Sequence, residues 1–178
     1  MPCAAGAVRV VLRWEAVVAV VDLFLKIDGV VGESLDSKHK GEIELESFAW
    51  AETQAAAPVA GGGGGAGKVH MQDLHVGMKF NKASPLLLLA CASGQHLKSG
   101  VLTARKAGKD AFEFLVYKFT DLIVSSYATS ATPEQQYPTD QVAFNFGRIQ
   151  VEYRPQQPDG KPGASVQAGW DVKANRKV

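Results

Sequence analysis

Cysteine, histidine and surplus charge are all scarce in this chain of 178 residues. The two cysteines, Cys3 and Cys91, are too few for a disulfide framework. Nineteen basic and 18 acidic residues leave a formal net charge of +1, and no basic block is present that could follow a phosphate backbone. We therefore predict that the chain does not bind nucleic acid.

Long apolar runs are also missing. No stretch approaches the roughly 20 apolar residues of a membrane span, so we expect no membrane insertion. The N-terminus has arginines ahead of an apolar patch, as export signals do. However, Glu15 interrupts it, and the uncharged run 16–21 is shorter than the roughly 7 to 15 residues of a signal core. We expect no cleavable signal peptide, and residues 1–20 to be an extension that is disordered or reflects a start codon assigned too far upstream.

The common catalytic motifs GxSxG, HExxH and CxxC do not occur. Glu42, Glu44 and Glu46 share one face of a predicted strand. A solvated face is favoured over a catalytic carboxylate ladder, because their neighbours are charges and not an apolar pocket that raises a pKa. Ser125 and Ser126 have no base nearby. None of the four histidines, His39, His70, His75 and His96, has other possible ligands at the spacing of a metal site. The sequence predicts no catalytic residue, metal or cofactor, and the protein is not expected to be an enzyme.

Glycine, in contrast, is concentrated in the run GGGGGAGKV from Gly61 to Val69. Its spacing nearly matches a phosphate-binding loop, but Val69 stands where a hydroxyl must coordinate magnesium. The preceding residues have a loop composition, and the following ones alternate like a strand, whereas a phosphate loop requires a strand before it and a helix after it. The run is interpreted as part of a long flexible loop over residues 52–67. A nucleotide-binding enzyme that uses Lys68 is kept as an alternative.

From Asp22 onward the chain reads as short strands separated by turn residues. In the segment ASPLLLLACASGQH, Ser84 can cap a helix, Pro85 suits its first turn and Gly94 can end it. Because this helix is apolar on nearly all sides, we expect it to be largely covered. The alternation of apolar residues changes phase at Gly147, which predicts a bulge there. The predicted fold class is mainly β, one domain over residues 21–178: an antiparallel β-barrel of two packed sheets with one short flanking α-helix at about residues 84–92.

Several ordered segments together cover about Asp22 to Lys177: DLFLKIDGVVGESLDSKHKGEIELESFAW, GGGGGAGKVHMQDL, KASPLLLLACASGQHL, RKAG, DLIVSS, FNFGRIQVEYRPQ and GWDVKAN. As an ordered set they resemble the haemolysin-coregulated protein (Hcp) family of bacterial type VI secretion. The resemblance implies a homohexameric ring, stacked into the inner tube of a contractile injection device. It also implies contacts with the sheath and spike proteins, small secreted effectors in the ring lumen, and a protein that is cytoplasmic before firing and then secreted to the extracellular space or a target cell.

The resemblance further implies that the glycine-rich loop is an arm that reaches a neighbouring subunit or ring. The residues expected at this inter-subunit or ring-stacking contact are Glu52, Thr53, Gln54, Pro58, Gly61, Gly62, Gly63, Gly64, Gly65, Gly67 and Lys68. A monomeric ligand-binding β-barrel is the other alternative, and the mass of the purified protein separates it from a ring.

Overall fold

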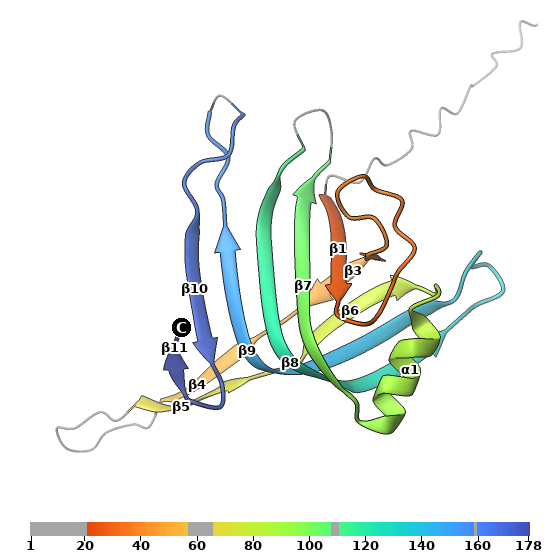
Figure 1. Cartoon of the computed structure of the whole chain (residues 1–178), viewed down its shortest axis with the longest axis horizontal. Coiled ribbons are helices and arrows are strands. Elements are labelled where there is room, and N and C mark those ends of the chain that lie inside the picture. Colours follow the sequence, from red (N-terminus) through yellow and green to blue (C-terminus); the bar gives the residue numbers. More distant parts are fainter. Residues whose placement is uncertain (1–20, 57–65, 108–110, 159) are drawn as a thin grey trace, which may run out of the picture.

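The computed structural model describes residues 21–56, 66–107, 111–158 and 160–178 (Figure 1). Its elements in chain order are β1 (Val21–Ile27), β2 (Ile43–Leu45), β3 (Ser47–Ala49), β4 (Glu52–Ala56), β5 (Ala66–Met71), β6 (Leu74–Lys79), α1 (Ser84–Ser93), β7 (His96–Lys106), β8 (Glu113–Ser130), β9 (Thr139–Tyr153), β10 (Val166–Asp171) and β11 (Arg176–Lys177). The expected N-terminal extension of residues 1–20 lies outside the described residues. No described helix has the length and apolar character needed to span a bilayer.

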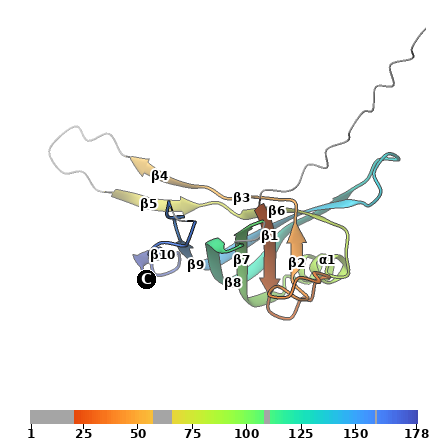
Figure 2. The same ribbon diagram turned by 90° about the horizontal axis from the view of Figure 1, so that it is seen from above.

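Nine strands join into one antiparallel sheet in the order β11-β10-β9-β8-β7-β1-β2, with β6 pairing to β9 and β3 pairing to β6. The strands β8 and β9 are 18 and 15 residues long. The first part of β9 pairs with β6, whereas its second part pairs with β10. The two long strands therefore carry the sheet through a bend, so that one continuous sheet supplies both sides of the core (Figures 1 and 2).

β9 changes its second partner between Phe144, which pairs with β6, and Arg148, which pairs with β10, and in this stretch Gly147 lies opposite Asp121 of β8. Asp121 has φ 58°, a left-handed conformation that a short polar side chain tolerates better than most. A Cβ added to Gly147 would lie 3.1 Å from Oδ2 of Asp121, so the glycine leaves room for this close approach. The ladder shifts register in β8, between Val124 and Ser126. The change of phase at Gly147 thus marks the bend, but the bulge predicted there is wrong, because the β8–β9 ladder keeps one register from Thr120 opposite Arg148 to Val124 opposite Phe144.

The mainly β class is confirmed, but the sheet does not close into the predicted barrel of two packed sheets. β2 pairs with β1, and the chain then crosses to pair with β6 as β3. Between the two strands, the backbone N–H of Glu46 donates to the carbonyl of Gly77 at 2.8 Å. Because β2 and β3 are only three residues each, they are too short to give a continuous ladder to both neighbours.

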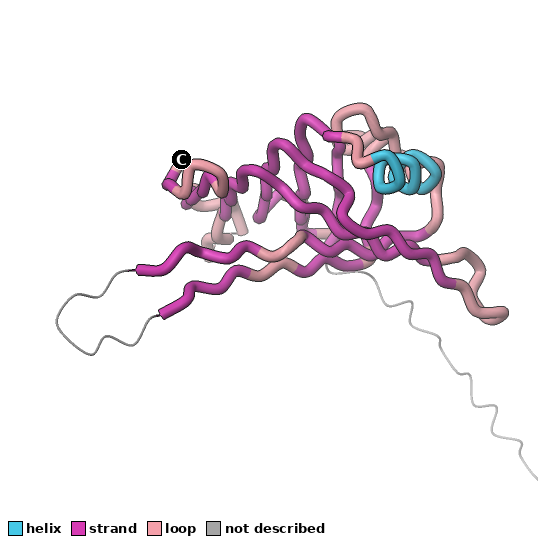
Figure 3. The backbone as a smooth tube through the Cα atoms, turned by 90° about the horizontal axis from the view of Figure 1, so that it is seen from below, coloured by secondary structure: helices cyan, strands magenta, loops and turns pink. Residues whose placement is uncertain are grey.

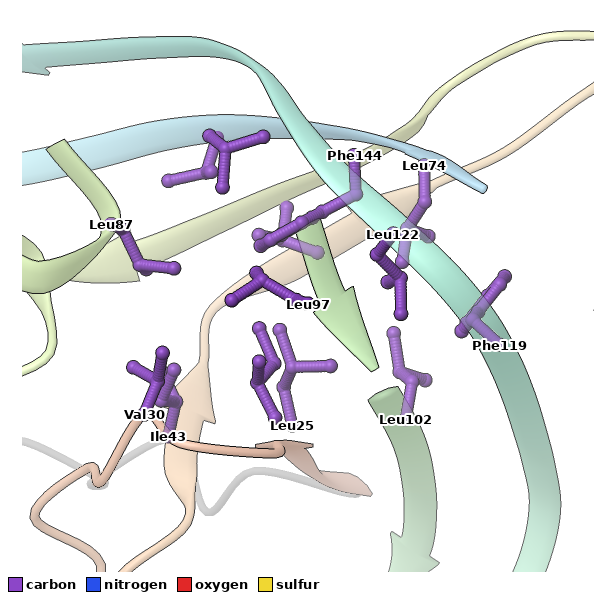
Figure 4. Packing of buried hydrophobic residues seen from close by; sticks show 14 of the residues in the cluster. Leu25, Val30, Ile43, Leu74, Leu87, Leu97, Leu102, Phe119, Leu122 and Phe144 are labelled. Carbon is purple, nitrogen blue, oxygen red and sulfur yellow. The ribbon is translucent and has the colours of Figure 1, made fainter. Parts of the chain in front are cut away.

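The hydrophobic core fills the space that the bent sheet encloses (Figure 4). Phe144 on β9 and Phe119 on β8 are buried, and they meet Leu25 of β1 and Ile43 of β2 in one cluster. Leu87 joins this cluster from α1 and points inward in the close view. The core thus ties together elements that are far apart in the sequence, which fixes the positions of the surfaces described below.

The loop between β1 and β2 is fastened to β7 by charged groups. Arg105 contacts the carboxylates of Asp22 and Asp36 at 2.9 and 2.7 Å, and its guanidinium carbon lies 5.0 Å from the ring centroid of Phe24. Asp36 also accepts the backbone N–H of Lys38 at 2.9 Å. The hydrogen bond from Arg105, followed by that from Lys38, holds the pKa of Asp36 well below its ordinary value. The loop is therefore held best when Asp36 is ionised.

The helix α1 ends one residue beyond the predicted range, with Gly94 in the left-handed conformation at φ 64°. Its Pro85 lies in the first turn, as predicted. Ser84 is not the cap that the sequence suggests, because the N-cap position is Ala83 and no side chain caps it. The Ser84 hydroxyl instead accepts the backbone N–H of Asn81 at 3.0 Å. The predicted helix boundaries therefore agree with the observed ones to within one residue.

Candidate assembly surfaces

The glycine-rich segment expected as a loop over residues 52–67 forms a hairpin arm. β4 and β5 pair antiparallel from Glu52 opposite Met71 to Gln54 opposite Val69, and the register then shifts. Residues 52–56 and 66–67 therefore lie in strands, because the chain on either side of the glycines pairs with itself. Figures 2 and 3 show the arm running out beyond the end of the main sheet.

The predicted contact residues divide between the arm and the part that is not described. Glu52, Thr53 and Gln54 lie on β4, and Gly67 and Lys68 lie on β5. The remaining members, which are Pro58 and Gly61, Gly62, Gly63, Gly64 and Gly65, fall outside the described residues. A strand at Lys68 and Val69 is incompatible with a phosphate-binding loop, which leads into a helix. The backbone thus argues against the nucleotide-binding alternative.

A groove of about 750 Å³ lies between the base of the arm and the end of the main sheet. Trp50 and Tyr117 line it, with ring centroids 6.3 Å apart, and Trp170 of β10 also contributes. The indole N–H of Trp50 donates to the carbonyl of Gln72 at 3.1 Å, which fixes the ring against the arm. Burial raises the pKa of the Tyr117 hydroxyl. The groove is therefore largely apolar, and its walls come from elements that only the fold brings together.

A second apolar surface lies on α1. Its inward face is formed by Ser84, Leu87 and Ala90, which are buried. The prediction that the helix is largely covered was wrong, because Leu86, Leu88 and Leu89 are 45%, 52% and 59% exposed. A helix packed on one side of a sheet buries one stripe and leaves the rest to solvent. We call these three leucines the helix ridge.

The histidine and glutamate candidates do not form a chemical site. His39 is buried, and its Nδ1 lies 2.9 Å from Oε2 of Glu42. The His39 ring stacks on Phe24 with centroids 4.1 Å apart, so that both residues serve the packing of the loop before β2. Glu44 and Glu46 are exposed. Among the described residues, no group of three or more His, Cys, Asp or Glu side chains could hold a metal ion.

Of the two serine candidates, Ser125 takes part in a surface hydrogen-bond cluster. The hydroxyl of Ser125 donates to Oδ2 of Asp73 at 2.5 Å, and Asn145 donates to the other oxygen of the same carboxylate at 2.8 Å. A nucleophile needs a base that accepts its proton and a site that binds a substrate. Here the carboxylate is shared with an amide and the group is exposed, which is typical of a structural cluster; this one joins the connection between β5 and β6 to the middle of β8 and β9.

Taken together, these features define a class of protein. The described chain offers apolar surfaces at separate places and a projecting arm, and it brings no set of catalytic groups together. Exposed apolar patches of this kind mark contacts with other protein chains. Such surfaces are typical of a subunit in a larger protein assembly.

Comparison with known proteins gives the family. Residues 24–153 match the family model "Type VI secretion system effector, Hcp". The chain is 41% identical over 157 residues to the protein hcp1 of Pseudomonas aeruginosa, covering 87% of this chain and 97% of the relative. It is also similar to the crystal structure of Hcp1 from Salmonella typhimurium, with a TM-score of 0.77 and 38% identity over 90% of this chain and 100% of that one. A structure of a type six secretion system protein matches with a TM-score of 0.83 and 36% identity, over 88% and 99% of the two chains.

The chain therefore belongs to the Hcp family of type VI secretion proteins. The resemblance read from the ordered sequence segments is confirmed. Members of this family are secreted structural components of the type VI tube, and this is the family function of the chain.

The groove and the helix ridge were not predicted from the sequence. The groove was missed because Trp50, Tyr117 and Trp170 are far apart in the chain, and alternation alone does not tell which strands become neighbours. The helix ridge had a visible signal. Four consecutive leucines in a helix of ten residues cannot all face one sheet, so at least one must point away from it.

Proposed function

We propose that this chain is the ring subunit of a type VI secretion tube, in which six copies close into a ring and the rings stack. The observation that carries the proposal is the family match over residues 24–153. Ring closure requires two different surfaces on each subunit, because head-to-tail contacts are heterologous. The groove and the helix ridge are two such surfaces, and they lie on different elements.

Size measurement of the purified protein tests the ring. We expect light scattering to give a particle of six times the 19.0 kDa monomer mass, and negative-stain images to show annular particles. A single 19.0 kDa particle in every buffer and at every concentration would contradict the proposal. That outcome would favour the monomeric ligand-binding protein instead.

We further propose that the arm makes the inter-subunit or ring-stacking contact. The arm projects past the main sheet, and its strands pair with each other and with no third strand in the described part of the chain (Figure 3). Replacing residues 57–65 by an Asn-Gly turn shortens the arm and keeps β4 and β5 paired. If the arm acts in stacking, the variant forms rings of normal mass that no longer build tubes. If it acts within the ring, the rings themselves are lost, and normal tubes would contradict both roles.

We also propose that the tube is cytoplasmic before firing, contacts sheath and spike proteins, and leaves the cell with small effectors in its lumen. The family match supports this route, since its members are secreted through the type VI apparatus. In a cell that carries the apparatus, the protein is expected in the culture medium only when the sheath is intact. Export that persists without a sheath would refute the route. An effector that co-purifies with rings, but not with an assembly-deficient variant, would support carriage in the lumen.

A further inference from the structure

We propose that the helix ridge of one copy docks into the groove between arm and sheet of the next copy, and that this contact closes the ring. The inference rests on the ring function proposed above and names the surfaces that serve it. The ridge consists of Leu86, Leu88 and Leu89, and the groove is the one lined by Trp50, Tyr117 and Trp170.

The two surfaces lie at opposite ends of the molecule. In Figure 1 the helix α1 lies toward one end of the long axis, and β4, β5 and β10, which line part of the groove, lie toward the other. The view from above shows the same separation (Figure 2). A chain cannot dock its own ridge into its own groove at this distance. Contact between them is therefore intermolecular, and its repetition gives a head-to-tail series that can close into a ring.

The ridge has the shape and chemistry of an inserted element. Residues 84–93 contain no charged side chain. At 3.6 residues per turn, Leu89 lies near the centre of the exposed face, and Leu86 and Leu88 lie on either side of it. Their exposure is unusual for a helix of a monomeric protein, where apolar residues face the core. Leu87, from the same run, shows the contrast, because it is fully buried beneath them.

The groove has a matching chemistry. Its walls include the apolar residues Val69 and Met71 of β5 and Val151 of β9, in addition to the aromatic rings. Aromatic residues and methionine are enriched in protein interfaces and supply large contact areas. Its walls are also far apart in the sequence, so that a docked helix would hold the arm and the sheet in one arrangement. An apolar helix laid in an apolar groove is a common mode of protein recognition.

One exposed charge lies beside each surface, and these two charges are opposite in sign. Glu52 is the one charged residue among the described residues that line the groove. It is exposed and makes no ion pair with any described residue. Lys82, two residues before α1, is exposed as well, and within the described part of the chain its side chain has no acidic partner. Opposite charges at the rim of an apolar contact favour one orientation over others and speed association. A second copy of this chain is therefore the occupant that fits the groove.

Two glutamate variants test the contact, one on each surface. Leu89→Glu places a charge on the ridge, and Ala168→Glu places one in the groove, where Ala168 is an exposed lining residue of β10. Each single variant is expected to remain folded and to need at least a tenfold higher concentration to form rings. Sedimentation velocity over a dilution series measures this shift, and circular dichroism checks the fold.

Mixing the variants gives the sharper test. The Leu89→Glu copy keeps an intact groove, and the Ala168→Glu copy keeps an intact ridge. In an equimolar mixture, the ridge of the second copy can therefore dock into the groove of the first. The other junction places two carboxylates together and stays open. We expect a one-to-one dimer of the two variants at concentrations where each alone is monomeric. A mixture that remains monomeric would overturn the inference.

Matched controls keep the test specific. Leu35→Glu changes a leucine that is 90% exposed and belongs to the loop between β1 and β2, and Val166→Glu changes an exposed residue on β10 outside the groove. Both are expected to form rings like the unchanged protein. Normal rings from Leu89→Glu or Ala168→Glu would overturn the ridge-and-groove contact and leave the ring function intact. A different result would refute the proposed ring function itself, namely that the unchanged protein forms no ring.

Discussion

Leu87 and Leu89 offer a matched comparison, because the same substitution on one helix should affect folding at one position and assembly at the other. Leu87 is fully buried in the core, whereas Leu89 is 59% exposed. Leucine to alanine removes three carbon atoms, and at about 0.8 kcal/mol for each the lost transfer free energy is about 2.4 kcal/mol for a fully buried side chain. The cavity that remains raises the loss of unfolding free energy for Leu87→Ala to about 3 kcal/mol.

For Leu89→Ala the same transfer term applies to less than half of the side chain, which gives at most about 1 kcal/mol. The change in helix propensity is the same at both positions, so it cancels from the comparison. Urea unfolding is measured in the Ala168→Glu background, where the chain is expected to be monomeric and assembly does not add to the apparent stability. Leu87→Ala is expected to lower the melting temperature by about 6 to 12 °C. Equal losses at the two positions would refute the claim that the helix has one covered and one open face.

Two further predictions concern the loop before β2. The pKa of Asp36 is lowered by Arg105, so its contribution to stability is complete above the pKa of the unfolded chain, about 3.9, and is lost as the pH falls toward the folded value. In Asp36→Asn, the unfolding free energy measured by urea titrations should therefore fall less steeply below about pH 4 than in the unchanged protein. An equally steep fall in both proteins would contradict a stabilising role of the ion pair between Asp36 and Arg105. Gly32→Ala should destabilise the fold strongly, because its Cβ would lie 2.2 Å from the carbonyl oxygen of Glu42. Gly29→Ala, with φ 82° and open space around it, should lower the melting temperature less, and the reverse order in thermal melts would refute this reasoning.

Local features of the fold followed from the sequence because they depend on neighbours along the chain. Pro85 and Gly94 located the helix to within one residue, since both act on their own backbone dihedrals. The change of phase at Gly147 located the bend of the sheet. It did not identify the residue that distorts, because Asp121 lies on another strand and its left-handed conformation depends on the space that Gly147 leaves.

Features that depend on which strands become neighbours were beyond the sequence pattern. The predicted loop over residues 52–67 contains paired strands, because pairing between β4 and β5 supplies backbone hydrogen bonds that composition does not reveal. The order of residues along the chain determined the helix ends, the alternation of the strands and, through the ordered segments, the family. Tertiary structure decided that the sheet stays open, that Leu87 is covered while Leu89 is not, and that Trp50, Tyr117 and Trp170 share one groove. The physical reason is that dihedral preferences act between adjacent residues, whereas burial and grooves arise from contacts between segments that the sequence separates by tens of residues.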